Sequence, residues 1–500
     1  MSANKPHNVY NRDVEWADLA GFVTGPGPRL RLGIVYGRRR FGKSHLLRGL
    51  VEAVGGIYHL ALQEERRTAL DRFAAILSHH HPGEPPFRFG DWTAALTFAV
   101  NMLGQAPRGP GVLVLDEYPY LRHTSPELDS TIQALIDETT AGSVGGDWTS
   151  PVTVIVCGSA MSVMTSILSG ASPMRGRATL DMPLASFDYR QARGFWGIDD
   201  PEVAFAVDAI VGGAAGYKDL TIAAGSPLRT DDLGDWLAST AINPSHALFR
   251  EDEYLLREDP RITAEAPYYS LLQAISRGPI SQGRIAAAVG RAPGDIVHHL
   301  KVMTTAGFVV RDDDLLTARR PVYRIADPIV RFHHLITRRH RAMLEQRRAS
   351  EVWSASARTY RSQIVGPHFE FLCREWVNRY AAPETLGGPV GTAHRVQVND
   401  PNRRQSFELD IAAAAPEGGP GRHLTLQAVG EAKASRLDIS DLTRLDRLTQ
   451  LLAGRDRVSP SPTLKLLLFS LDGFTPALIG GANRRSDVEL IDPDRLYHGA

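Results

Sequence analysis

The chain alternates between short apolar runs and longer stretches whose apolar residues recur at helical spacing. Apolar runs occur at residues 32–36, 57–62, 111–115 and 152–157, and an amphipathic segment follows each of them. Buried strands that alternate with helices are typical of a parallel sheet covered by helices on both faces. Residues 1–190 are therefore predicted to form an α/β domain.

The pattern changes after residue 190, and three further regions follow. Residues 191–262 are mostly helical in pattern and would form a lid. Residues 263–345 show the order of a winged helix-turn-helix, with helices expected at 269–275, 281–289 and 296–303 and strands at 307–310 and 322–325.

The last region, residues 350–500, mixes both periodicities. An amphipathic helix is expected at 366–376 and a hairpin of alternating strands at 406–412 and 423–433. A helix at 440–452 and strands at 464–470 and 488–491 complete it. The predicted fold class is thus a multidomain α/β chain.

Composition and charge limit the classes of binding partner and the cellular compartment that we expect. The 500 residues suggest about three domains, and the 56 basic and 56 acidic residues balance, so a nucleic-acid surface would be a local patch. Cys157 and Cys373 lie far apart, which fits a reducing compartment and excludes a disulfide framework. No run approaches 18 apolar residues and the start is polar, so we expect a soluble, cytoplasmic protein without a membrane partner.

The first chemical signal follows the apolar run at 32–36. Residues 37–44 read G-x-x-x-x-G-K-S between a predicted strand and a predicted helix. The glycines let backbone N–H groups point at phosphates, Lys43 can reach the β- and γ-phosphates, and Ser44 can bind Mg²⁺. The predicted nucleotide-binding residues here are Gly37, Arg38, Arg39, Arg40, Phe41, Gly42, Lys43, Ser44 and His45.

Two acids end the apolar run at 111–115. Asp116 is expected to hold Mg²⁺ through water, and Glu117 to orient and deprotonate the attacking water. Ser159 follows the run at 152–157 and would face the γ-phosphate if that strand lies between the other two. Such an additional strand, together with the lack of an Asn-Lys-x-Asp guanine motif, favours ATP as the nucleotide.

Two arginines and a glycine loop have open roles. Arg175 and Arg177 either place a guanidinium on the γ-phosphate, in cis or from a neighbouring subunit of a homo-oligomer, or pair with surface acids. Arg177 is included among the predicted nucleotide contacts. The loop at 211–217 would pack on the nucleotide domain as part of the lid.

In this order the motifs resemble the archaeal-type ATPase family, within the STAND and AAA-like additional-strand P-loop NTPases. The resemblance rests on residues 37–44, 115–118, 157–162, 175–178 and 211–213, and it covers most of the chain. It implies ATP hydrolysis, a helical lid, a winged helix and a nuclease-like C-terminal domain.

The C-terminal region carries the second chemical signal. Period-2 geometry puts Glu431 and Lys433 on one face of their strand, and a hairpin would bring Asp410 beside them. Asp410 and Glu431 can bind Mg²⁺, and a lysine can polarise the attacking water. The pattern resembles the PD-(D/E)xK nuclease superfamily, with its restriction-endonuclease-like α/β fold, in which Glu370 matches the acidic residue of the first helix.

Together these signals predict an ATPase coupled to a Mg²⁺-dependent DNA nuclease-like domain, in which the nucleotide state controls DNA engagement or cleavage. The winged helix would contact DNA through His298, His299 and Lys301, or else serve in domain packing. The alternative function is a nucleotide-switched DNA-binding regulator or scaffold whose nuclease fold does not cleave.

Overall fold

The structure is a computed structural model that describes residues 3–80, 86–106, 109–170, 172–316, 321–400, 405–416 and 423–500. The chain divides into two compact units. Unit 1 is the chain up to Phe187 with two later segments, Ala214–Gly216 and Leu255–Thr263, and unit 2 is the remainder. The chain changes unit at 187/188 and 263/264, close to the expected boundaries at 190/191 and 262/263, and two pieces of the expected lid group with unit 1.

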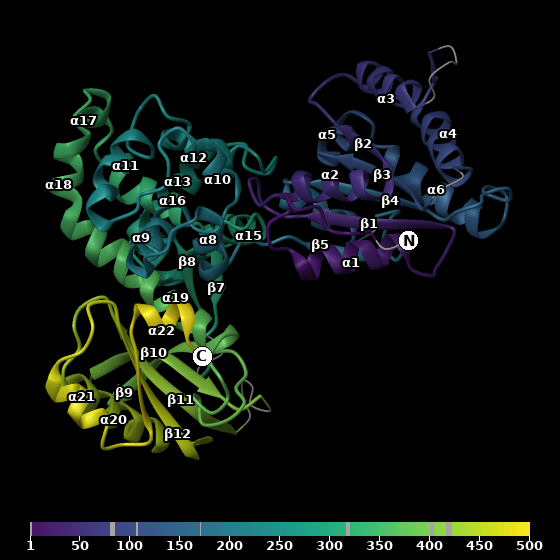
Figure 1. The fold of residues 1–500 in the computed structure, drawn as a ribbon. Coiled ribbons are helices and arrows are strands. Elements are labelled where there is room, and N and C mark those ends of the chain that lie inside the picture. The colour runs from purple at the N-terminus through teal and green to yellow at the C-terminus, as the bar shows by residue number, and fades with distance from the viewer. Residues whose placement is uncertain are drawn as a thin grey trace. The chain divides into compact units, whose positions relative to one another are not determined.

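A five-stranded parallel sheet forms the centre of unit 1, with strand order β2-β3-β4-β1-β5 (Figure 1). Its strands are β1 (Leu30–Tyr36), β2 (Ile57–Leu60), β3 (Gly111–Asp116), β4 (Val152–Gly158) and β5 (Ala178–Pro183). β4 lies between β1 and β3, which is the strand order under which Ser159 was expected to face the γ-phosphate.

Helices cover both faces of this sheet because alternate strand residues point to opposite sides. Leu113 and Leu115 join one apolar core, with α3 (Arg66–His80), α4 (Trp92–Gly104) and α6 (Leu128–Thr140). Val112 and Val114 join the other, with α1 (Asp13–Thr24) and α2 (Lys43–Val54). Two short helices, α5 (Tyr118–Thr124) and α7 (Met161–Ile167), follow β3 and β4.

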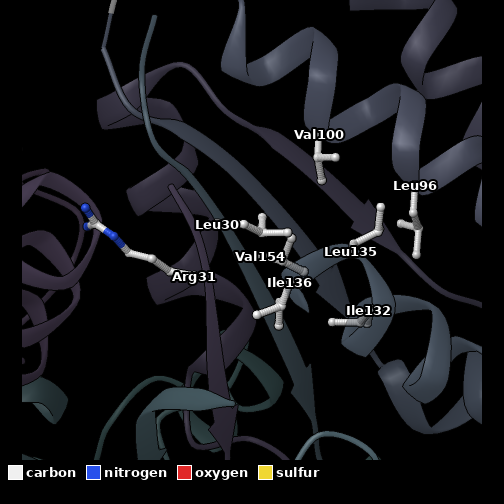
Figure 2. A pocket seen from close by; sticks show the side chains of 8 residues that line it. All are labelled: Leu30, Arg31, Leu96, Val100, Ile132, Leu135, Ile136 and Val154. Carbon is white, nitrogen blue, oxygen red and sulfur yellow. The ribbon is translucent and has the colours of Figure 1, made fainter. Parts of the chain in front are cut away.

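A cavity of about 10 Å³ lies within the first of these cores, between β1, β4, α4 and α6. Figure 2 shows that its lining is aliphatic and that the Arg31 guanidinium points away from the other side chains. Arg31 donates instead to the carbonyls of Phe22 and Gly25, at 2.5 and 2.6 Å. A space this small and apolar is a packing gap and not a ligand site.

A buried histidine in the same core gives unit 1 a pH dependence. His59 on β2 is 0% exposed, packs edge-on against Phe73, and has no hydrogen-bond partner for either ring nitrogen among the described residues. Burial lowers the pKa of His59 from 6.5 to about 4. Between these values the unfolded chain binds the extra proton, so stability falls as the pH falls.

We expect His59→Leu to remove this acid sensitivity. Since each pKa unit corresponds to about 1.4 kcal/mol, the variant should gain up to about 3 kcal/mol over the wild type as the pH falls from 7 to 4. Urea unfolding across this pH range measures the difference, with the exposed His79→Leu as control. A difference that stays constant with pH would contradict the prediction.

Unit 2 begins with a mainly helical part. Its helices are α8 (Tyr189–Trp196), α9 (Pro201–Val211), α11 (Leu233–Ser239), α16 (Pro328–Phe332), α17 (Arg341–Glu345), α18 (Ala349–Thr359), the 3-10 turns η1 (Thr230–Asp232) and η2 (Ala247–Arg250), and the π-helical turns η4 (His333–Thr337) and η5 (Tyr360–Val365). The chain passes between the units at α10 (Gly216–Leu220) and α12 (Glu251–Leu256).

A small helical and sheet region lies inside this part of the chain. It contains α13 (Glu265–Ile275), β6 (Ile280–Ser281), α14 (Gln282–Ala288), η3 (Pro293–Ile296), α15 (Val297–Thr305), β7 (Val309–Asp312) and β8 (Val322–Ile325). The strands pair antiparallel in the order β6-β8-β7. The three α-helices and β8 fall close to the expected positions, β7 lies two residues later than the expected strand, and β6 and η3 were not predicted.

The C-terminal part of unit 2 is a five-stranded mixed sheet of order β13-β12-β11-β10-β9 (Figure 1). Its elements are α19 (Gly366–Arg379), β9 (His394–Asp400), β10 (Gln405–Ala414), β11 (Leu424–Lys433), α20 (Ile439–Ala453), β12 (Val458–Ser470), α21 (Pro476–Ala482), β13 (Val488–Ile491) and α22 (Pro493–His498). β9, β10 and β11 are antiparallel neighbours, whereas β11, β12 and β13 run parallel.

The segment after β7 joins this sheet to the smaller one. Leu315 is 9% exposed and belongs to the apolar core of the C-terminal sheet, where it packs with Val396 and Leu409. Asp314 Oδ2 accepts a hydrogen bond from the backbone N–H of Gln397 at 3.1 Å. The β7–β8 hairpin is therefore engaged in packing within unit 2. Over the described ranges, no helix combines the length and apolarity needed to cross a membrane.

Candidate functional site

The loop after β1 has the curled backbone that the glycine motif predicts. A Cβ at Gly37 would lie 2.2 Å from the carbonyl oxygen of Leu184, so a side chain there cannot fit. Arg40 and Gly42 have positive φ angles of 69° and 89°, in the left-handed region. Gly42 directly precedes α2, whose N-terminal N–H groups are suited to bind an anion.

Lys43 and Ser44 start α2 from this loop. Lys43 is buried, and its Nζ donates to the carbonyl oxygen of Arg38 at 3.0 Å. Arg38 itself is 7% exposed. The lysine is thus held across the loop, and its charge is near enough to Glu117 to oppose the rise in the pKa of that carboxyl.

Other predicted nucleotide contacts in the loop bind protein groups. Arg39 forms an ion pair of 2.9 Å with Glu258, His45 Nε2 lies 2.9 Å from the Asn8 carbonyl, and the Phe41 carbonyl accepts from Arg12 at 3.1 Å. Arg12 also donates to the Ala185 carbonyl at 2.7 Å, which ties the loop to the end of β5. Arg39, Phe41 and His45 therefore brace the loop.

The acids at the end of β3 lie next to this loop. Asp116 is fully buried, and its Oδ1 accepts the Glu117 N–H at 2.9 Å. Glu117 adopts a φ of 53°, which is rare for a residue with a side chain and is often found at functional sites. Ser159 Oγ lies 3.3 Å from Glu117 Oε2. Burial, followed by the charge of Asp116, raises the pKa of Glu117, whereas Lys43 opposes the rise.

Tyr58 on β2 is a site residue that the sequence did not reveal. Its hydroxyl donates to Asp116 Oδ2, and Ser44 is near enough to act against the rise in the pKa of the phenol. Burial, then the charge of Asp116, raises the pKa of this phenol. Tyr58 therefore connects the two predicted Mg²⁺-binding residues. Only the position of β2 beside β3 could have pointed to it.

Arg177 is not brought to this site. Its guanidinium makes a bidentate ion pair with Asp137 on α6, with N–O distances of 3.0 and 2.8 Å. Arg175 donates to the carbonyl of Gly170 at 3.1 Å. Of the two roles left open, the pairing with a surface acid is the one in the structure, because Asp137 lies within reach and Arg177 is anchored to it.

Two pieces of the expected lid contact the loop after β1 and the helix after β4. The Gly216 N–H donates to the carbonyl of Arg40 at 2.9 Å, so the segment around Gly216 contacts the loop at 37–44. Asp259 accepts from Ser162 on α7 at 2.9 Å, and Glu258 pairs with Arg39. Burial raises the pKa of Glu258, although Arg39 opposes it.

The second group of predicted residues converges in unit 2. Ile411 on β10 pairs with Gly430 on β11, so the next pair along the hairpin is Asp410 and Glu431. Oxygens of Glu370 on α19, Glu408 and Asp410 lie within 4.8 Å of one another. We call Glu370, Glu408, Asp410 and Glu431 the carboxylate cluster. Glu408 was not predicted, although its position two residues before Asp410 places it on the same strand face.

Asp410 and Glu431 of the carboxylate cluster are buried, Glu370 and Glu408 are half-buried, and the four negative charges repel one another. Burial and the charge of Asp410 raise the pKa of Glu370 to about 7 and that of Glu431 to about 7. Burial also raises the pKa of Asp410, although its carboxylate accepts the Ala432 N–H at 2.9 Å. Glu431 is 5% exposed, and its Oε2 has no hydrogen-bond partner among the described residues. A divalent cation fits this site, since it would satisfy that oxygen and relieve the repulsion.

Basic side chains surround the carboxylate cluster. Arg444 forms an ion pair with Glu431, and Lys433 pairs with Asp441 while its Nζ stays 4.0 Å from Glu431 Oε1. Arg374 donates to the backbone carbonyl of Asp410 at 3.0 Å. Lys433 is therefore beside the cluster, as the sequence predicted, but its strongest partner is Asp441.

Comparison with known proteins adds distant similarities. No family model matches the sequence. The uncharacterized protein MJECL04 of Methanocaldococcus jannaschii is 24% identical over 309 residues, which span 60% of this chain and 62% of that relative's length. The chain thus aligns with less than two thirds of the relative.

The solved structures that this chain resembles include archaeal ATPases. The Walker-type ATPase paby2304 of Pyrococcus abyssi has a TM-score of 0.46 at 18% identity, covering 67% of this chain and 99% of that one. The Aeropyrum pernix ORC2 protein, in its ADPNP–ADP complexes, has a TM-score of 0.47 at 13% identity, covering 71% and 97%. Likenesses of this size do not define a family, so the geometry of the two sites decides what function to propose.

Proposed function

We propose that unit 1 binds and hydrolyses ATP. The supporting observation is the strand order, which places the acid pair after β3 and Ser159 after β4 beside the glycine loop after β1. Strands of a parallel sheet present their carboxyl ends to the ligand at one edge.

Each residue of this site would have its own role in ATP binding and hydrolysis. The N–H groups of the loop and Lys43 would bind the phosphates, and Ser44 and Asp116 would hold Mg²⁺, which neutralises the developing phosphate charge. Glu117, with its raised pKa, would accept a proton from the attacking water, and Ser159 would hold its carboxylate in place. Tyr58 would hold the side chains of Ser44 and Asp116 in position relative to each other.

Replacing Lys43 tests the nucleotide site. We expect Lys43→Ala to weaken binding of an ATP analogue at least tenfold, because the variant lacks the cation that faces the phosphates. Titration calorimetry with a non-hydrolysable analogue measures this, and the exposed Lys301→Ala in unit 2 is the control. Equal affinity in wild type and Lys43→Ala would reject the assignment.

For the carboxylate cluster we propose Mg²⁺-dependent cleavage of DNA phosphodiester bonds. The supporting observation is that Glu370, Asp410 and Glu431 come together from α19 and the β10–β11 hairpin. The order of one helix, three antiparallel strands, a helix and a parallel strand fits the predicted PD-(D/E)xK nuclease fold. The metal would stabilise charge on the phosphate, and Lys433 would orient the attacking water.

DNA is the proposed partner, and the region from α13 to β8 is proposed to be the winged helix. Arg284, Arg291, His298 and Lys301 are exposed on it. The hairpin that would form the wing packs against β9 and β10, so DNA would be contacted by the helices. We propose that the nucleotide state of unit 1 controls this engagement, in a monomer or a homo-oligomer.

One observation favours the alternative of a non-cleaving regulator or scaffold. Lys433 and Glu431, which would act on water and metal, are both held in ion pairs, with Asp441 and Arg444. Incubation with plasmid and linear DNA, with and without ATP and Mg²⁺, separates the two functions. Mg²⁺-dependent cleavage supports the nuclease, whereas DNA binding without cleavage supports the regulator.

A further inference from the structure

The carboxylate cluster of unit 2 already has a cation beside it, the guanidinium of Arg395. Arg395 lies on β9 and forms an ion pair with Glu408 on the neighbouring strand β10. Glu408 is one of the three acids whose oxygens lie within 4.8 Å of one another. A guanidinium and a divalent metal need the same carboxylate charge, so their binding here is competitive.

Arg395 differs from the other arginines around the cluster. Arg374 donates to the backbone carbonyl of Asp410, and Arg444 pairs with Glu431 from α20. Among the ion pairs formed by described residues, that of Arg395 is the one with a member of the triplet Glu370, Glu408 and Asp410. The Arg395 side chain is 19% exposed and that of Glu408 is 37% exposed, so the pair is partly shielded from water.

The structure also provides a place for the guanidinium to go. Arg395 and Glu408 line a groove of about 500 Å³ that is bounded on its other side by Arg284 of α14 and Asp312 of β7. Rotation of the Arg395 side chain into this groove would free Glu408 without moving β9 or β10. Asp312 also lines the groove, and although it pairs with Arg324 at 2.8 Å, its negative charge acts favourably on Arg395 as well.

We propose that Arg395 is a built-in competitor of the metal: it pairs with Glu408 in the metal-free protein, and metal binding displaces it into the groove. This inference rests on the proposed metal site and adds its regulation. Metal affinity is then lower than the carboxylates alone would give, and loss of Arg395 raises it.

The test is calorimetric titration of Mn²⁺ into the metal-free full chain, counting only the binding that Asp410→Asn removes. Arg395→Gln should bind Mn²⁺ about tenfold more tightly than the wild type, because the competing charge is gone. Arg447→Gln is the matched control, since Arg447 pairs with the buried Asp400 at 3.0 Å on the same sheet, outside the cluster. Arg395→Met, with a similarly long stem, replaces the glutamine variant if that variant does not fold.

The outcomes separate this inference from the proposed function. Unchanged or weaker binding in Arg395→Gln, or equal tightening in Arg447→Gln, overturns the competition and leaves the metal site in place. Absence of Asp410-dependent binding in both the wild type and the variant overturns the metal site and the competition together. Binding in Arg395→Gln alone supports both.

Discussion

Glu117→Gln is expected to lower ATP turnover by about 10²- to 10⁴-fold while leaving ATP binding unchanged, because a glutamine cannot accept the proton of the attacking water. The geometry indicates that this substitution removes the proton acceptor while keeping the neighbouring hydrogen bond. Ser159 Oγ lies 3.3 and 3.5 Å from the two carboxylate oxygens of Glu117, and the retained amide oxygen of glutamine can still accept from it. Phosphate release measures turnover, and calorimetry with ATP measures binding.

A matched control for this substitution is Glu127→Gln. Glu127 pairs with the surface residue Arg66 at 2.9 Å, in the same unit but outside the site, so turnover should stay near that of the wild type. Persistent turnover in Glu117→Gln would remove Glu117 from the chemistry, and another group would then have to accept the proton of the attacking water.

Asp410→Asn is expected to lower Mg²⁺-dependent DNA cleavage by more than about a hundredfold. Loss of residues that merely support a metal ligand already costs about 10- to 100-fold, and Asp410 would bind the metal itself. The asparagine can still accept the Ala432 N–H through its amide oxygen, so the hairpin should fold as before.

A second measurement shows whether the variant acts through the metal. Without metal, Asp410→Asn should melt at a higher temperature than the wild type, because one of the buried, mutually repelling charges is gone. Added Mg²⁺ should stabilise the wild type and not the variant. The buried Asp400→Asn on β9 is the control, and cleavage that survives Asp410→Asn would rule out the nuclease assignment.

Local patterns predicted the parts of both sites that lie on regular elements. The glycine motif has a fixed spacing, and the buried strands end at Asp116 and just before Ser159, so these residues and Lys43 could be located on their elements from the sequence. Period-2 geometry put Glu431 and Lys433 on one strand face, and the predicted hairpin brought Asp410 beside Glu431.

The remaining residues depend on packing that no local pattern encodes. Tyr58 reaches Asp116 only because β2 lies beside β3, and Arg12 reaches Phe41 from 29 positions away. The sequence left two roles open for Arg177, and Asp137 on α6 lies close enough to bind it. Two pieces of the expected lid group with unit 1, where Glu258 pairs with Arg39 across 219 positions.

The docking of Leu315 affects how unit 2 can be dissected. Burying a leucine stabilises a fold by about 1.5 to 3 kcal/mol. Leu315 precedes the expected boundary at 345/350, but it is buried in the apolar core of the C-terminal sheet, which follows that boundary. The small sheet and the C-terminal sheet should therefore unfold in one cooperative transition. A fragment cut between residues 345 and 350 would expose Leu315 on one piece and the apolar surface around Val396 on the other, so both pieces would be prone to aggregate.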